Sequence, residues 1–440
     1  MSISKYEFEM LSTPSCINFY KEDYKDGDKL GTPIRNWSKI LFKDSLFDFF
    51  PYSEIYFKDS AGQIVDSVYF VEGLEFHCKL GFQEETVKDK DDNDKKIGGY
   101  LEHDYIWSAF EINNITFAQS ISGDNMFMMV SKHFYNDYPQ SRTFNHESST
   151  TKQTISNILI NTILPAWGID KNKFRGGEKG KEINSITDTT GTPYLNQNNI
   201  SNKLFVSKLA EYAYSQNNKA SGFYTFINCN GEFYFMTIQG MLNQPPVRKY
   251  KIDLHQDMMT DEYYIKDYRV LNGGVPVNFE NYKRKIYRYK ADGTNIAETK
   301  NIQTYANESE LDTATQLLIR KQYIPTVNSK VTYGGIQEEE NGLEFYQGFV
   351  NYFYRDTLLC YRMVIVVDFY AGLVSGKTIE IEVEKQTKTN EIAGEFSGKW
   401  LICESIHIMD KNGIPYSQLT ISKPQIKIDQ SHPFKKDFTP

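Results

Sequence analysis

Residue types that do chemistry are present in this chain, but their spacing does not match a known reaction centre. The glycine-rich segment 176–181 at first suggests a phosphate-binding loop. Arg175 stands where that motif has its first glycine, and Glu182 stands where it has the magnesium-binding serine or threonine. We therefore interpret the segment as a surface loop.

The acidic run near residue 90 suggests a calcium site. Asp89, Asp91 and Asn93 have the spacing of the first three ligands of a calcium loop. Asp94 replaces the glycine that such a loop needs for its sharp turn, and Tyr100 replaces the closing glutamate. The charged segment 88–96 is therefore predicted to be the solvated tip of a long hairpin.

The histidines and cysteines form neither a zinc pattern nor a nucleophile with an adjacent base. His407 stands between Ile406 and Ile408 on an expected strand, which predicts a structural imidazole hydrogen-bonded between strands. Carboxylate pairs are ordinary in their spacing, so nothing supports a hydrolytic pair. We predict no catalytic residue, no cofactor site and no metal site. The histidines are His77, His103, His133, His146, His255, His407 and His432, and the cysteines, interpreted as reduced core residues, are Cys16, Cys78, Cys229, Cys360 and Cys403.

Composition favours a β-rich subunit of an assembly. The 440 residues allow about three domains of roughly 150 residues each. The 31 tyrosines and 29 phenylalanines favour strands and protein interfaces. A net charge of −8 argues against a clamp for nucleic acid, which needs many basic contacts. In the basic stretch 283–290 charge falls on both faces, which indicates an exposed edge strand or a subunit contact.

Residues 1–30 show no signal peptide, and the apolar run Met363–Val367 is too short to span a bilayer. The expectation is a protein without stable membrane insertion that is assembled in a cytoplasm.

One pattern of strands occurs twice and must be explained by any fold. In the first copy an alternating strand, 74–82, leads through a charged loop to a strand with Trp107 and then to the run 126–130. In the second copy the strand 378–383 leads through a loop to the strand 400–409 and then to 416–421. Glu111 follows Trp107, and Glu404 follows Trp400, by the same interval.

A segment of mixed helices and strands separates the two copies. A helix is predicted over 151–164, stopped by Pro165, and a second helix follows the cap Ser201, with Leu204, Phe205, Leu209 and Tyr212 as its apolar stripe. Strands 223–229 and 232–238 flank Asn230–Gly231 as a hairpin. Further helices are predicted over 308–322 and 348–362.

These observations predict a β-rich α+β, multidomain chain. It would contain two similar small β-barrel tube domains, an α+β domain and an outer insertion. The predicted domains are 1–145 (first barrel), 146–245 (α+β outer domain), 246–290 with 351–423 (second barrel), 291–350 (insertion) and 424–440 (C-terminal tail). The tail contains Pro424, Pro433 and Pro440, and both an arm lying on a neighbour and a frayed end fit its composition.

The order of segments resembles the central baseplate hub protein of contractile phage tails, a family related to the hub part of type VI secretion spikes. The resemblance covers nearly the whole chain as weak motifs in the right order. They are FKDSLFD at 42–48, EIYFKDS at 54–60, the segment from Asn202 through GFYTFINCNGEFYFMTI to Asn243–Pro245, Tyr354–Tyr361 with Leu373–Ile379, WLICESIHIM at 400–409 and YSQLTIS at 416–422. The charged loop 88–96 and the excursion from about 290 to 345 depart from it, which leaves the outer partners open.

The resemblance implies a structural virion protein. Three chains with two barrels each would form a pseudo-sixfold ring, a homotrimer that joins the hexameric tail tube to a trimeric central spike. DNA would only pass through its channel, and tape-measure and baseplate wedge proteins would be further partners. Two alternatives remain: the hub of a contractile injection or secretion machine that delivers protein, and, from another class, a tail-associated cell-wall hydrolase.

Overall fold

The computed structural model describes most of the predicted strand pattern. The described residues are 5–10, 17–21, 32–34, 37–58, 75–88, 94–113, 124–144, 155–176, 195–212, 223–252, 265–273, 285–288, 300–301, 331–333, 359, 361–383, 396–410 and 415–423.

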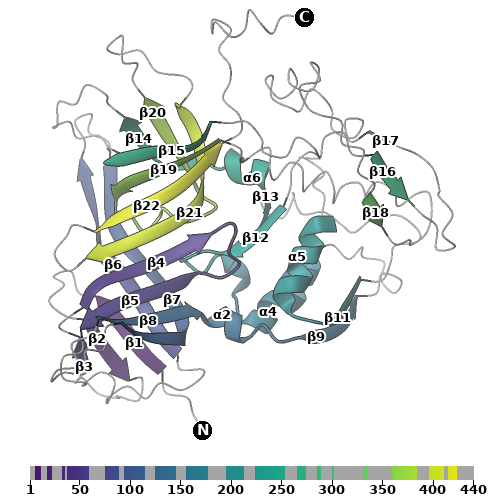
Figure 1. The fold of residues 1–440 in the computed structure, drawn as a ribbon, viewed down its shortest axis with the longest axis horizontal. Coiled ribbons are helices and arrows are strands. Elements are labelled where there is room, and N and C mark those ends of the chain that lie inside the picture. The colour runs from purple at the N-terminus through teal and green to yellow at the C-terminus, as the bar shows by residue number, and fades with distance from the viewer. Residues whose placement is uncertain are drawn as a thin grey trace, which may run out of the picture.

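A 14-stranded sheet dominates the fold and forms the left half of the molecule in Figure 1. Strands β14 (Pro246–Ile252) and β20 (Thr378–Val383) pair with each other, and β20 also pairs with β21. The remaining strands follow in the order β15 (Asp267–Gly273), β19 (Tyr361–Asp368), β22 (Tyr416–Lys423), β21 (Gly398–Asp410), β4 (Trp37–Ser45), β5 (Tyr52–Lys58), β8 (Asp124–Ser131), β7 (Asp94–Asn113), β6 (Glu75–Lys88), β1 (Lys5–Met10), β2 (Ile17–Lys21) and β3 (Thr32–Ile34).

The sheet consists of two modules with the same pairing and the same chain order. In the first module, β1 runs parallel to β6, and β6–β7–β8–β5–β4 follow as antiparallel neighbours. In the second module, β14 runs parallel to β20, and β20–β21–β22–β19–β15 follow in the same way. The repeat of three strands predicted from the sequence is thus present, and it extends to three more strands in each module.

A β-bulge marks the equivalent position in both modules. The pairing of β7 with β8 shifts between Trp107 and Ala109, and the pairing of β21 with β22 shifts between Ile402 and Glu404. Counted from the bulges, Trp107 corresponds to Ile402 and Tyr105 to Trp400. The equal Trp-to-Glu intervals noted in the sequence therefore do not mark equivalent positions.

The two modules are joined edge to edge along one seam. Strand β4 of the first module pairs antiparallel with the second half of β21, from Ser45 opposite Glu404 to Lys39 opposite Asp410. Because of this seam the described strands form one open sheet. The two separate small barrels expected from the sequence are not confirmed among the described strands, because the two modules share one sheet.

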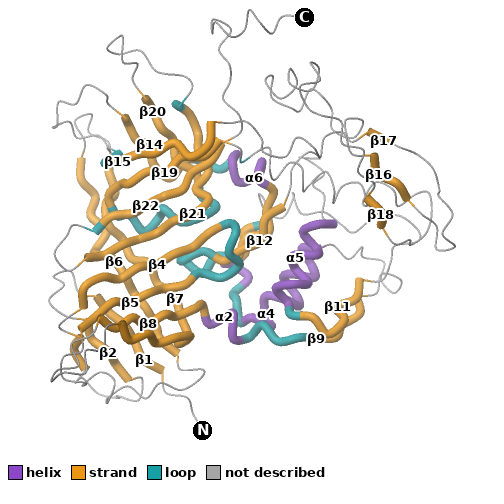
Figure 2. The backbone as a smooth tube through the Cα atoms, in the orientation of Figure 1, coloured by secondary structure: helices purple, strands orange, loops and turns teal. Residues whose placement is uncertain are grey.

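The α+β unit lies beside the sheet, in the teal part of Figure 1, and Figure 2 shows its helices in purple. It contains the strand pair β9 (Gln140–Phe144) and β11 (Leu195–Ile200), and the sheet β10 (Phe174–Arg175), β13 (Phe233–Thr237) and β12 (Phe223–Ile227). Its helical segments are α2 (Lys132–Tyr135), α3 (Ile155–Ile158), the π-helix η1 (Leu159–Ile163), α4 (Leu164–Trp167), the 3-10 helix η2 (Lys171–Lys173), α5 (Asn202–Tyr212) and α6 (Ile238–Asn243).

Two details of this unit correct the sequence prediction. Pro165 does not end the helical segment, because it lies in the first turn of α4 directly after the π-helix η1, and the chain stops being helical at Gly168 (φ 72°). Ser201 caps α5 as predicted, with the N–H of Leu204 bonded to its Oγ at 3.2 Å, but the side chain of Leu204 is exposed.

The hairpin β12–β13 forms as predicted, although its connection is longer than two residues. Residues 228–232 make the turn, in which Asn228 Oδ1 accepts hydrogen bonds from the N–H groups of Asn230 and Glu232, both at 3.0 Å. Gly231 supplies the positive φ of 68°.

The basic stretch lies in a small separate sheet. Strand β16 (Lys285–Arg288) lies between β17 (Lys300–Asn301) and β18 (Val331–Tyr333). The edge-strand interpretation is therefore wrong for residues 285–288, because both edges of β16 are paired. The predicted helix 308–322 lies outside the described residues, and so does 348–358, while Tyr361 and Arg362 belong to strand β19 rather than to a helix.

Three apolar clusters stabilise these elements. One fills the α+β unit around Trp167 and Phe233, and a second fills the second module around Trp400. The third lies at the junction and joins Leu46, the hairpin residues Phe226 and Tyr234, and Leu401 of β21. No helix in the described part of the chain is long and apolar enough to cross a membrane.

Candidate assembly site at the module junction

A buried carboxylate, Asp44, holds the junction together. It follows Ile40 and Phe42 on the inward face of β4, and only 1% of it is exposed. One carboxylate oxygen, Oδ1, accepts hydrogen bonds from the hydroxyl of Ser405 at 2.6 Å and from the N–H of Ser375 at 3.0 Å. The other oxygen accepts the N–H of Cys229 at 2.7 Å. One side chain therefore ties β4 to β21, to the loop before β20 and to the hairpin of the α+β unit.

The neighbouring His407 extends this buried network, but the arrangement is not a hydrolase triad. The imidazole Nδ1 lies 2.9 Å from the hydroxyl of Ser417, and burial lowers the pKa of His407 to about 4, against the opposing charge of Asp44. Asp44, Ser405, His407 and Ser417 are all buried. A substrate has no path to these groups, and His407 has the structural role that its position in the sequence predicts.

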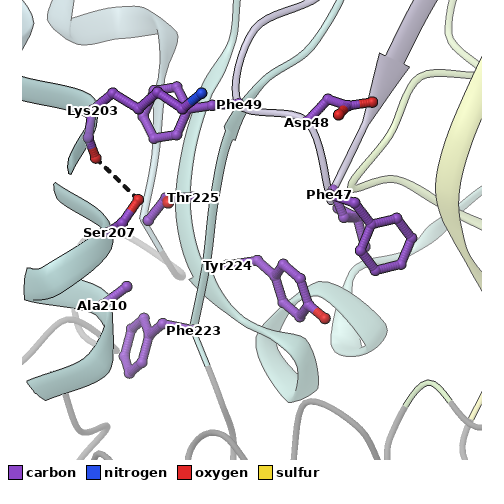
Figure 3. A pocket seen from close by; sticks show the side chains of 10 residues that line it. Phe47, Asp48, Phe49, Lys203, Ser207, Ala210, Phe223, Tyr224 and Thr225 are labelled. Atoms are coloured by element: carbon purple, nitrogen blue, oxygen red, sulfur yellow. Dashed lines mark hydrogen bonds between the residues drawn. The ribbon is translucent and has the colours of Figure 1, made fainter.

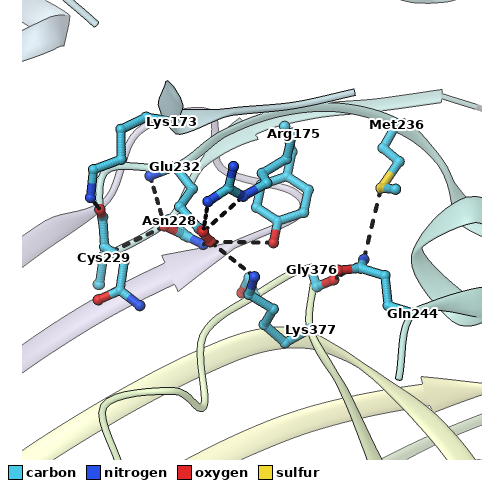
Figure 4. A network of polar contacts seen from close by, with 12 residues as sticks. Lys173, Arg175, Asn228, Cys229, Glu232, Met236, Gln244, Gly376 and Lys377 are labelled. Carbon is cyan, nitrogen blue, oxygen red and sulfur yellow. Dashed lines mark hydrogen bonds and ion pairs between the residues drawn. The ribbon is translucent and has the colours of Figure 1, made fainter. Parts of the chain in front are cut away.

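A second polar network, around Glu232, joins the α+β hairpin to the second module (Figure 4). The carboxylate of Glu232 lies 2.8 Å from Arg175 Nη2 and 3.3 Å from Lys377 Nζ, and it accepts a hydrogen bond from Asn228 Nδ2 at 2.9 Å. Burial opposes ionisation of Glu232, but Lys377, Asn228 and Arg175 outweigh it and lower the pKa of the carboxyl. The charge at this junction is thus compensated.

Gly376 lets the second module approach the hairpin closely. Its φ is 87°, and a Cβ at this position would lie 2.8 Å from ring atoms of both Phe226 and Tyr234. Its carbonyl accepts a hydrogen bond from Gln244 Nε2 at 2.9 Å, also visible in Figure 4. Only glycine fits both this backbone conformation and this contact.

Two buried imidazoles connect the first module to the α+β unit. The rings of His103 on β7 and His133 on α2 lie 5.5 Å apart. His103 Nε2 lies 2.8 Å from the hydroxyl of Ser131, and His133 Nδ1 lies 2.8 Å from the carbonyl of Trp167. Burial lowers the pKa of both rings, and the neighbouring His133 lowers that of His103 further. Both are therefore neutral at pH 7.

An open pocket of about 290 Å³ lies between the turn after β4 and the α+β unit (Figure 3). Its lining includes Phe47, Asp48, Lys203 and Ser207. Ser207 donates its hydroxyl to the carbonyl of Lys203 at 3.0 Å, so this hydroxyl is engaged by the helix itself. The lining lacks a pair of groups placed for acid–base chemistry.

The predicted site residues are dispersed rather than gathered. Arg175 lies in the Glu232 network, and Gly176 is the last described residue before the glycine-rich loop. Lys88 pairs with Asp94 at the end of the β6–β7 hairpin, which confirms that the charged segment is a hairpin tip, while 89–93 lie outside the described residues. Cys229 and Cys403 are buried free thiols. Within the described part of the chain there is no group of three or more His, Cys, Asp or Glu that could hold a metal ion.

Sequence reasoning missed Asp44, Glu232 and Gly376. A signal for Asp44 was present, because it continues the two-residue period of Ile40 and Phe42 and so places a charge on a buried face.

The solved structures that resemble this chain include tail proteins and a component of a secretion system. No protein-family model matches the chain, and no curated relative matches it. Among solved structures, the 43 kDa tail protein of prophage MuSo2 from Shewanella oneidensis is 9% identical with a TM-score of 0.46, over 91% of this chain and 98% of that one. A tail protein from Neisseria meningitidis is 7% identical with a TM-score of 0.45, over 90% and 95%.

A third structure is an E. coli component of the type VI secretion system, 10% identical with a TM-score of 0.38, over 89% of this chain and 74% of that one. In its sequence pattern and in these comparisons alike, the chain resembles tail and spike proteins. Because the TM-scores are below 0.5, the function is argued from the geometry of this chain.

Proposed function

We propose that this chain is a structural subunit of a phage tail baseplate, the trimeric hub that joins the hexameric tail tube to a trimeric spike. The observation that supports the proposal is the seam between the two modules. Two equivalent modules already lie side by side in one chain, joined through β4 and β21. Three such chains contain six modules. In a closed ring of three chains the six modules are related by approximate sixfold symmetry, and the three whole chains are related by exact threefold symmetry.

The chemistry of the junction fits a rigid adapter. The Asp44 and Glu232 networks fix the modules and the α+β unit to one another through buried, charge-assisted hydrogen bonds. A ring that bears the load of a tail needs such fixed angles, whereas an enzyme needs an accessible reactive group. In this proposal the α+β unit and the sheet β16–β18 lie on the outside of the ring and contact wedge proteins. The tape-measure protein and DNA occupy its channel.

Molecular mass in solution tests the proposal directly. Mass photometry of the purified chain across a concentration series, followed by electron microscopy with and without the neighbouring spike protein, is expected to show a threefold ring around a channel. A chain that stays monomeric alone and with the spike would refute the hub.

The hydrolase alternative is tested separately. The purified chain is incubated with peptidoglycan and the release of soluble fragments is measured. Sustained release that survives repurification would overturn the purely structural proposal.

A further inference from the structure

Strand β15 of the second module is exposed, whereas its counterpart in the first module is buried. Three of its apolar side chains face solvent: Tyr268 is 44% exposed, Val270 40% and Leu271 49%. The counterpart of β15 is β4, where Ile40 and Phe42 are each 3% exposed. The difference has a simple cause. Both edges of β4 are paired, with β5 and β21, whereas β15 pairs with β19 alone among the described strands.

The repeat also identifies the strand that would pair with the other edge of β15. Within the chain, the equivalent edge of β4 pairs with residues 404–410 of β21. Counted from the equivalent bulges, residues 404–408 of β21 correspond to residues 109–113 of β7. Among the described strands, residues 109–113 pair only with β8, so no described strand pairs with their other edge. Each module thus presents both halves of the seam, but within one chain only one pair of halves can meet.

The repeat also fixes the register of the unmade seam. In the second module, successive paired residues across the sheet are Val270, Met363, Ile421 and the bulge residue Ile402. In the first module, the same path runs through Phe42, Ser53, Met129 and the bulge residue Trp107. Val270 therefore corresponds to Phe42. Phe42 lies opposite His407, which is five residues after the bulge residue Ile402 of β21. The residue five positions after the bulge residue Trp107 of β7 is Ile112, so Ile112 corresponds to His407.

We propose that β15 of one copy pairs antiparallel with residues 109–113 of β7 in a second copy, with Val270 opposite Ile112. The pairing would bury the exposed apolar side chains of β15 and set an aliphatic pair across the seam. The contact is head-to-tail, so each copy offers a different edge at each end, as ring closure demands.

Cysteine cross-linking of the full chain tests this register. The proposal rests on the trimeric hub, so oligomeric mass is measured on the same samples. In the double variant Val270→Cys with Ile112→Cys, each interface receives one thiol from each copy. Directly opposed Cβ atoms lie about 4.5–5.5 Å apart, close enough for a disulfide after small shifts. Mild oxidation is expected to give covalent dimers and trimers on a non-reducing gel.

The matched control is Arg269→Cys with Ile112→Cys, because residue 269 points to the opposite face of the strand. Each single variant controls for the native cysteines. Covalent trimer from the first pair and none from the control supports the register. Trimers by mass with no cross-link above the control would overturn the β15–β7 seam and leave the hub standing. Monomers under all conditions would overturn both.

A second variant tests the surface without cysteines. Val270→Lys places a charge opposite Ile112 at a position that is exposed in the single chain, so the melting temperature of the monomer stays unchanged while the trimer is lost. Leu204→Lys, on α5, changes an equally exposed leucine (48%) away from the seam and keeps the trimer. A Val270→Lys protein that trimerises at the same concentration as Leu204→Lys contradicts the proposal.

Discussion

Replacing Asp44 by asparagine tests whether one buried carboxylate holds the three parts of the junction. Asparagine keeps the size of the side chain but offers one acceptor oxygen where aspartate offers two. Ser405, Ser375 and Cys229 all donate to Asp44, and two of these donors are backbone N–H groups on opposite oxygens. Whichever way the amide turns, one buried backbone N–H faces an NH₂ group and loses its partner.

The magnitude follows from that lost partner. A buried donor without an acceptor costs about 1–3 kcal/mol, and hydrogen bonds to a charged group are worth about 1.5–3 kcal/mol each. Removing the buried charge offsets part of this loss of stability, because a neutral amide costs less free energy to bury than a carboxylate. We expect a net loss of about 2–4 kcal/mol, which lowers the melting temperature by roughly 5–15 °C for a cooperative unit of 150–250 residues.

The assay is thermal unfolding followed by fluorescence, with limited proteolysis to show which part loosens first. Asp48→Asn is the matched control, because Asp48 is exposed four residues away and its replacement should stay within about 0.5 kcal/mol of the wild type. Ser405→Ala, alone and combined with Asp44→Asn, measures the coupling between the two groups. An Asp44→Asn protein that melts with the wild type and resists protease equally would refute the reasoning.

Three further predictions concern the same junction. Gly376→Ala should lose about 2–4 kcal/mol, because its Cβ would meet the rings of Phe226 and Tyr234, whereas Gly168→Ala, also at positive φ but in open space, should lose only about 1 kcal/mol; equal melting temperatures would contradict the contact. Glu232→Gln should lose about 1–3 kcal/mol and expose the hairpin to hydrogen exchange, because Lys377 and Arg175 then lack their carboxylate; unchanged protection of residues 228–232 would show that the network is dispensable. Stability should fall on acidification: the pKa values of His103, His133 and His407 are lowered in the folded state, so the stability that their neutral rings contribute is complete above pH 6.5, the ordinary histidine value, and declines as the pH falls below it. For His407 this decline continues to about pH 4, its pKa in the folded state. His133→Gln should flatten this decline of the melting temperature with falling pH. The charged groups that act on His133 are Lys132 on α2 and Asp104 on β7. An unaltered slope of melting temperature against pH would argue against the imidazole pair.

Local signals in the sequence were sufficient for several of the individual elements. The two-residue alternation of 378–383, the run 416–421 and the Asn230–Gly231 turn reappear as strands and a hairpin, since these patterns depend on neighbours only a few residues apart. The same holds for the cap Ser201 and for the structural role of His407. Pro165 misled the prediction because its effect depends on whether it falls in the first turn of a helix or in its interior, and only the π-helix before it decides that.

By itself, then, the sequence determined that the chain carries a repeated set of strands around a mixed unit and that no reactive constellation lies within it at recognisable spacing. The tertiary structure decided how the repeats meet. Residues Asp44 and Ser405 stand far apart in the chain, and the seam between β4 and β21 exists because strand edges from both modules offer matching hydrogen bonds and buried faces. Pairing of distant strands leaves no local periodicity that would name the partner, which is why two barrels were expected where one continuous sheet is found.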